Sequence, residues 1–93
     1  MNDASAPPGA PATVRERLAL LVAQILARPE AAHSLPVDGS LSELGMSSIK
    51  MVNLMLAVEG EFDLTIPQHE ITPGNFRSIA SIEAMLARLL SAH

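Results

Sequence analysis

Residues 41–62 read LSELGMSSIKMVNLMLAVEGEF, a short turn that leads into a continuous helical pattern. Gly45 interrupts the pattern on its amino-terminal side, so a helix is predicted to begin at about Ser47, run to Glu61 and end near Phe62-Asp63. At 100° per residue, the apolar side chains of this helix fall on two stripes. The first contains Met51, Leu54, Met55, Val58 and Phe62, and the second contains Ile49, Val52 and Leu56.

One stripe is enough to bury a helix against a core, so the second stripe needs its own explanation. Its rim holds Lys50, Asn53 and Glu59 as the only polar residues. Two interpretations stay open at this point: the preceding loop covers the second stripe, or a partner protein binds it.

Two further helical patterns flank this helix. The first begins at Val14, behind a Thr13/Glu16 capping box, and Pro29 predicts that it ends near Arg28. The last begins behind Ser78, a predicted N-cap, and its apolar residues recur at helical spacing from Ile79 to Leu90. Between helix two and the last helix, residues 68–71 form at most one short turn before Thr72-Pro73-Gly74-Asn75.

The connection between the first two helices, residues 29–46, is unusually long for a small domain. Its apolar residues are predicted to anchor it to the helices; they are Leu35, Val37, Leu41 and Leu44. No segment alternates long enough to make a sheet. The predicted fold is therefore all-α: a small antiparallel four-helix bundle of three main helices and one short one, with a long loop between helices one and two. Residues 1–12, rich in proline and alanine, are predicted to form a flexible tail ahead of one folded domain over residues 13–93.

Composition excludes several classes of function. The chain has a net charge of −4 and only two aromatic residues, which argues against nucleic-acid binding. It has no cysteine, so any thiol chemistry must come from outside the chain. No apolar run approaches the length of a membrane span, and residues 1–12 lack the features of a secretory signal. A monomeric cytoplasmic protein is the consistent prediction.

Two adjacent serines stand where helix two begins. Ser47 is placed to cap the helix, which leaves Ser48 at the first helical position with its hydroxyl pointing outward. A phosphate ester on Ser48 would lie at the positive end of the helix dipole, beside free amide groups. From position alone, a redundant pair of caps explains the two serines as well.

The sequence LSELGMSSIKMV from Leu41 onward resembles the attachment motif of the acyl carrier protein family. In that family a leucine-glycine turn precedes the serine that receives 4'-phosphopantetheine from coenzyme A, and Ser48 matches that serine. The resemblance extends over about Val14 to Leu90 and includes the order of helices and loops. It implies a carrier domain that is not an enzyme and that holds an acyl group as a thioester. The implied partners are a phosphopantetheinyl transferase, an acyl-loading enzyme and a downstream acyl-transferring enzyme.

The resemblance also assigns roles to residues around Ser48. It implies that partner enzymes contact the start and the second stripe of helix two, and that two residues of the first stripe border a cavity for the cargo. The implied partner contacts are Met46, Ser47, Ile49, Lys50, Val52, Asn53 and Leu56, and the implied cavity residues are Leu54 and Val58. Met46 is expected to be exposed for this contact.

Three positions depart from the family's common pattern. Ser47 replaces the usual aspartate before the modified serine, and helix two carries Lys50 and Asn53 where the family is usually acidic. This weakens the charge on which fatty-acid enzymes rely for steering. Helix two and the segment that follows it look most similar to a bacterial subgroup loaded with amino acids by ligases that resemble a truncated seryl-tRNA synthetase. The resemblance thus implies an amino acid as cargo, with a fatty-acyl or polyketide-type carrier as the alternative.

Other classes fit the sequence less well. Gly45-Met46-Ser47 imitates half of a hydrolase nucleophile elbow, but Ile49 stands where the second glycine belongs. The three histidines, His33, His69 and His93, lack the close spacing of a metal site and are expected on the surface. A helical adaptor that carries no cofactor is the main alternative of another class, and it predicts that Ser48 is dispensable.

Overall fold

A computed structural model describes residues 13–91 of the chain. The element order is α1 (Val14–Ile25), a 3₁₀ turn η1 (Pro29–Ala31), α2 (Ser48–Phe62), a 3₁₀ turn η2 (Gln68–Glu70) and α3 (Ile79–Ser91). The predicted all-α class is confirmed, and the described residues contain no strand. The short fourth helix is a single 3₁₀ turn. The predicted tail, residues 1–12, lies outside the described residues, as does His93.

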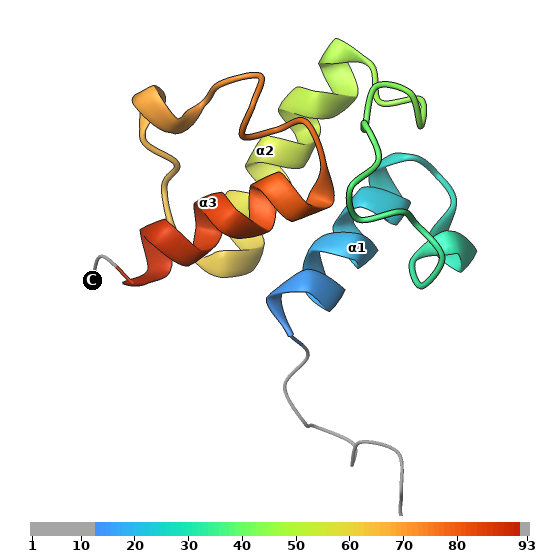
Figure 1. Cartoon of the computed structure of the whole chain (residues 1–93), viewed down its shortest axis with the longest axis horizontal. Helices are drawn as coiled ribbons and strands as arrows, with labels where there is room; N and C mark the ends of the chain where they lie inside the picture. The colour runs from blue at the N-terminus through green and yellow to red at the C-terminus, as the bar shows by residue number, and fades with distance from the viewer. Residues whose placement is uncertain (1–12, 92–93) are drawn as a thin grey trace, which may run out of the picture.

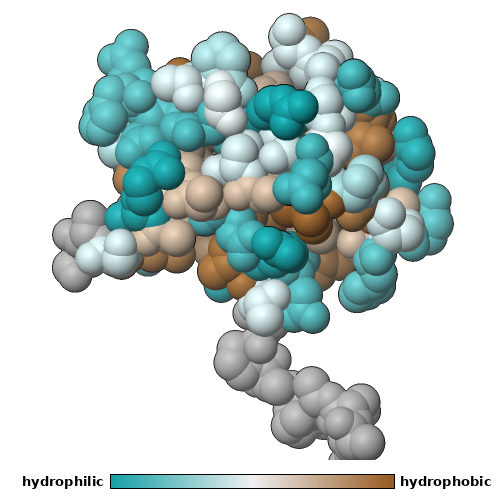
Figure 2. Space-filling view, viewed as in Figure 1, coloured by the Kyte–Doolittle hydropathy of each residue, from teal (hydrophilic) through white to brown (hydrophobic). Residues whose placement is uncertain are grey.

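Helix α1 packs against both α2 and α3 (Figure 1). The core draws on all three helices and on the long loop. Its fully buried large side chains are Leu18, Val22, Leu41, Leu54, Val58, Ile79, Ile82, Met85 and Leu86. Figure 2 shows polar residues over much of the surface in this view, with apolar patches between them. None of the described helices is long and apolar enough to cross a bilayer.

The amino-terminal boundary of α1 is as predicted, and its carboxyl end is not. Thr13 and Glu16 form the expected capping box. The helix ends at Ile25 rather than near Arg28, because Ala27 adopts a left-handed conformation with φ of 60°. The amide of Ala27 donates to the Gln24 carbonyl at 3.0 Å and that of Arg28 to the Ala23 carbonyl at 2.8 Å. This pair of bonds is a Schellman motif, which closes the helix before Pro29 is reached.

The long loop is anchored as predicted. Leu41 is fully buried, and its backbone amide donates to the Arg77 carbonyl at 2.8 Å. A second bond of 2.8 Å runs from the Ala80 amide to the Val37 carbonyl. The other predicted anchors, Leu35, Val37 and Leu44, are partly buried against the core. These contacts fix the loop against the start of α3 and thereby set the position of the turn that leads into α2.

Candidate functional site

The turn before α2 places two serines at the start of the helix. Gly45 has a φ of 105°, a conformation that residues with a side chain rarely adopt. The turn is closed by the amide of Met46, which donates to the Leu41 carbonyl at 3.0 Å. Ser47 then adopts an extended conformation, and its hydroxyl accepts a 3.2 Å hydrogen bond from the Lys50 amide. Ser47 is therefore the N-cap of α2, as predicted.

Ser48 is the first residue of α2, and its side chain is exposed. The amides of Ser48 and Ile49 donate no hydrogen bond within the described residues, as expected at a helix start. These free amides and the helix dipole favour an anion at this end of α2. The accessible hydroxyl and the anion-favouring surroundings fit a phosphodiester on Ser48.

The second apolar stripe of α2 is exposed. The exposed fractions are 77% for Ile49, 53% for Val52 and 62% for Leu56. Asn53 is also exposed, and Lys50 is half-buried. The long loop does not cover this stripe, which removes the first of the two interpretations left open by the sequence. We call Ile49, Val52 and Leu56 the apolar face of α2.

The acidic residues of α2 are engaged within the protein. A carboxylate oxygen of Glu59 accepts from the Ile66 amide at 2.7 Å. Glu61 accepts from the Arg17 guanidinium at 2.7 Å, and the same guanidinium lies 4.3 Å from the centre of the Phe62 ring. Both carboxylates lie at the far end of α2 from Ser48. The part of the helix that bears the apolar face therefore has Lys50 as its only charged residue.

One placement expected from the sequence is wrong. Met46 is 4% exposed and belongs to the core, because the turn at Gly45 directs its side chain inward. Leu54 and Val58 are fully buried in the core, and their role at the border of a cargo cavity stays a prediction. The helical periodicity identified both residues as inward-facing.

A surface cleft lies on the Ser48 side of α2 and has a volume of about 610 Å³. Met51 and Met55 supply its α2 wall, and the segment between η2 and α3 supplies the opposite wall. Its lining residues are Ser40, Ser42, Met51, Met55, Ile71, Thr72, Pro73, Gly74, Phe76 and Arg77. The sequence analysis did not find this cleft, because its walls are far apart in the chain.

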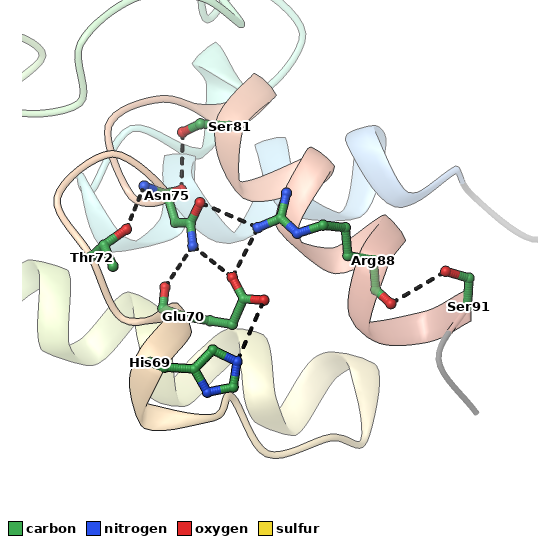
Figure 3. Close-up of polar contacts among 7 residues, drawn as sticks. All are labelled: His69, Glu70, Thr72, Asn75, Ser81, Arg88 and Ser91. Atoms are coloured by element: carbon green, nitrogen blue, oxygen red, sulfur yellow. Dashed lines mark hydrogen bonds and ion pairs between the residues drawn. The ribbon is translucent and has the colours of Figure 1, made fainter.

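A polar cluster holds the wall formed by residues 71–77 (Figure 3). The Asn75 side-chain amide donates to the Glu70 carbonyl at 2.7 Å and to the Glu70 carboxylate at 2.9 Å. Arg88 of α3 donates to the same carboxylate oxygen at 2.9 Å. The Ser81 hydroxyl of α3 donates to the Asn75 carbonyl at 2.9 Å. These bonds connect the cleft wall to α3 from outside the cleft.

This cluster predicts a pH dependence of stability. The hydrogen bond from Arg88 holds the pKa of Glu70 below its ordinary value of 4.5. A lowered native pKa stabilises the fold above the ordinary value, and this contribution is lost as the pH falls through the lowered pKa. We expect Glu70→Gln to reduce the free energy of unfolding at neutral pH and to have little effect in strong acid. Urea unfolding across this range measures the difference.

The matched control for this prediction is Arg88→Gln, which removes the largest cause of the lowered pKa of Glu70. In that background Glu70→Gln should alter the acid dependence of unfolding less than it does in the wild-type protein, because only the Asn75 and His69 contacts remain. If Glu70→Gln leaves the acid dependence of the otherwise unchanged protein intact, the assigned role of the ion pair is incorrect.

A family model described as "Phosphopantetheine attachment site" matches residues 16–89, which include the start of α2. The chain belongs to this family. The family consists of carrier proteins, and 4'-phosphopantetheine is its prosthetic group. The resemblance that the sequence indicated is thus confirmed, while Ser48 as the attachment residue stays a prediction.

Members of the family that are similar to this chain carry amino acids. Aminoacyl carrier protein 1 of Bradyrhizobium diazoefficiens is 48% identical over 73 residues, which cover 78% of this chain and 81% of the relative. A chain from the crystal structure of Bradyrhizobium japonicum glycine:[carrier protein] ligase complexed with glycylated carrier protein is also 48% identical. It matches with a TM-score of 0.65 over 78% of this chain and 99% of its own length.

A more distant member of the family supports the fold. The solution structure of a holo acyl carrier protein from Nitrosomonas europaea is 23% identical, with a TM-score of 0.77 over 86% of this chain and 99% of its own length. The helical arrangement described above is therefore that of an acyl carrier protein.

The alternatives weighed from the sequence gain no support at this site. His33 and His69 are exposed, as expected, and residues 13–91 contain no cluster of three potential metal ligands. The only hydrogen bond of the Ser47 side chain within these residues is the capping bond from Lys50. The nucleophile-elbow resemblance is thereby explained as a helix cap.

Proposed function

We propose that this chain is an aminoacyl carrier protein that holds an activated amino acid on a 4'-phosphopantetheine arm attached to Ser48. The observation that carries the proposal is the exposed Ser48 at the start of α2, in a chain 48% identical to an aminoacyl carrier protein. The arm supplies the terminal thiol on which a thioester forms, and the chain itself has no cysteine.

Attachment of the phosphopantetheine arm requires only an accessible hydroxyl group from the chain. The Ser48 oxygen forms a bond to phosphorus as a phosphate-oxygen bond of coenzyme A breaks, and adenosine 3',5'-bisphosphate leaves. A phosphopantetheinyl transferase supplies the base that takes the serine proton. The chain acts as a carrier and not as an enzyme in this proposal, and it works in the cytoplasm, where coenzyme A and the transferase meet it.

The loading enzyme in this proposal is an amino acid:[carrier protein] ligase. Its docking site is the apolar face of α2, with Ser47, Lys50 and Asn53 at the rim. The exposed side chains of Ile49, Val52 and Leu56 offer apolar contact area, while Lys50 is the only charge between Ser48 and Val58. Such a surface suits recognition by shape and apolar contact more than by electrostatic steering. A downstream transferring enzyme then accepts the amino acid.

The cargo is tested with the purified holo-protein. Separate reactions supply a panel of amino acids with an amino acid:[carrier protein] ligase, and a panel of fatty acids with an acyl-carrier-protein synthetase. We expect a mass gain of one aminoacyl unit, removable by hydroxylamine as a thioester is, and much weaker loading with long-chain acids. Loading with long-chain acids alone would contradict the aminoacyl assignment and leave the carrier role intact.

A further inference from the structure

The cleft beside α2 lies next to the point where the arm is attached. Ser48, Met51 and Met55 stand at positions i, i+3 and i+7 and therefore share one face of α2. At about 1.5 Å of rise per residue, the two methionines lie about 4.5 and 10.5 Å along the helix from Ser48. The cleft wall made by Met51 and Met55 is thus the surface that continues directly from the attachment serine.

The lining of the cleft suits neutral groups, because it contains no carboxylate that could pair with a cation. Most of its surface comes from apolar side chains, and its polar side chains are the hydroxyls of Ser40, Ser42 and Thr72. Its only charged lining residue is Arg77, which is exposed and takes part in none of the ion pairs within residues 13–91. Two carboxylates are adjacent in sequence to lining residues, and neither lines the cleft: Glu43 follows Ser42, and Glu70 is bound by Asn75 and Arg88 outside the cleft.

We propose that this cleft holds the unloaded arm and releases it when an amino acid is attached. The proposal rests on the proposed function above. A free thiol at the end of the arm is neutral and can be covered by Met51 and Met55. An aminoacyl thioester ends in an ammonium group, which would lose its hydration beside the Arg77 guanidinium with no anion to compensate. Loading therefore exposes the arm to the next enzyme, and unloading returns it to the cleft.

The arm's position can be followed through methionine methyl groups. The chain is labelled with ¹³C-methyl methionine and examined by NMR in the apo, holo, glycyl-holo and propionyl-holo forms. Glycyl and propionyl groups have nearly the same size and differ in an ammonium replacing a methyl group. Met46 and Met85 are buried and do not line the cleft, so they serve as internal references.

We expect the Met51 and Met55 methyl signals to shift between the apo and holo forms. The shift should persist in the propionyl form and disappear in the glycyl form, while Met46 and Met85 stay nearly unchanged. A charge reversal in the cleft, Arg77→Glu, should restore the shift in the glycyl form because a carboxylate can pair with the ammonium. Leu41 bonds to the backbone carbonyl of residue 77, so this variant keeps that contact. Arg28→Glu makes the same change of charge outside the cleft lining and should not restore it.

The mass of the intact chain distinguishes failure of the proposed function from failure of the release proposal. If the transferase adds no phosphopantetheine unit to the chain, the proposed function itself is wrong. If the mass gain occurs but Met51 and Met55 do not respond to the arm, or respond equally to the glycyl and propionyl groups, the carrier role stands and the release proposal is overturned.

Discussion

Replacing Ser48 by alanine is expected to abolish modification of the chain completely. Ser48 is exposed at the first position of α2, and the amides of Ser48 and Ile49 donate no hydrogen bond within the described residues. The apo-protein and the variant are incubated with coenzyme A and a broad-specificity phosphopantetheinyl transferase, and the intact chains are weighed. The wild-type chain should gain one phosphopantetheine unit, and Ser48→Ala should gain none.

The adjacent serine gives the matched control. Ser47→Ala should still be modified, but loss of the 3.2 Å capping bond to the Lys50 amide should destabilise the fold. The expected loss in the free energy of unfolding is about 1 kcal/mol, the usual cost of removing an N-cap. If Ser47→Ala lost the modification and Ser48→Ala kept it, the assignment of cap and attachment site would have to be exchanged.

Introducing a charge into the apolar face should block loading by the ligase. Leu56 is 62% exposed, so Leu56→Asp leaves the core intact while it forces a carboxylate into the proposed interface. At low carrier concentration, we expect the loading rate to fall about 30-fold or more, which corresponds to about 2 kcal/mol for an interface hot spot. The measurement is the initial rate of aminoacylation of the holo-protein by an amino acid:[carrier protein] ligase.

Leu90→Asp controls for the effect of a new surface charge. Leu90 is 40% exposed on α3, outside the apolar face, and its substitution should leave the loading rate nearly unchanged. Equal unfolding midpoints for the two variants would show that neither result comes from loss of structure. Normal loading of Leu56→Asp would show that the ligase binds elsewhere on the carrier.

Local signals in the sequence predicted most of the fold. The Thr13/Glu16 pair and Ser47 were recognisable as caps because capping depends on residues three positions apart. The 3.6-residue periodicity separated Leu54 and Val58, which are buried, from Ile49, Val52 and Leu56, which are exposed. Ser48 followed from the same local reading together with the family motif.

Features that depend on tertiary contacts could not be predicted from the sequence. The left-handed conformation of Ala27 is unusual for alanine and is stabilised by the Schellman bonds that end α1. Burial of Met46 depends on how the turn at Gly45 meets the core. The cleft and the Glu70-Arg88 cluster join residues from separate elements, so no local pattern signals them.

The most direct test is isolation of the native protein from its own cells under acidic conditions that preserve thioesters, followed by mass spectrometry of the intact chain and its fragments. We predict a phosphopantetheine unit localised to Ser48, with a fraction of molecules bearing an additional aminoacyl mass that hydroxylamine removes. Native protein that is always bare at Ser48, in cells whose transferase modifies other carriers, would contradict the account.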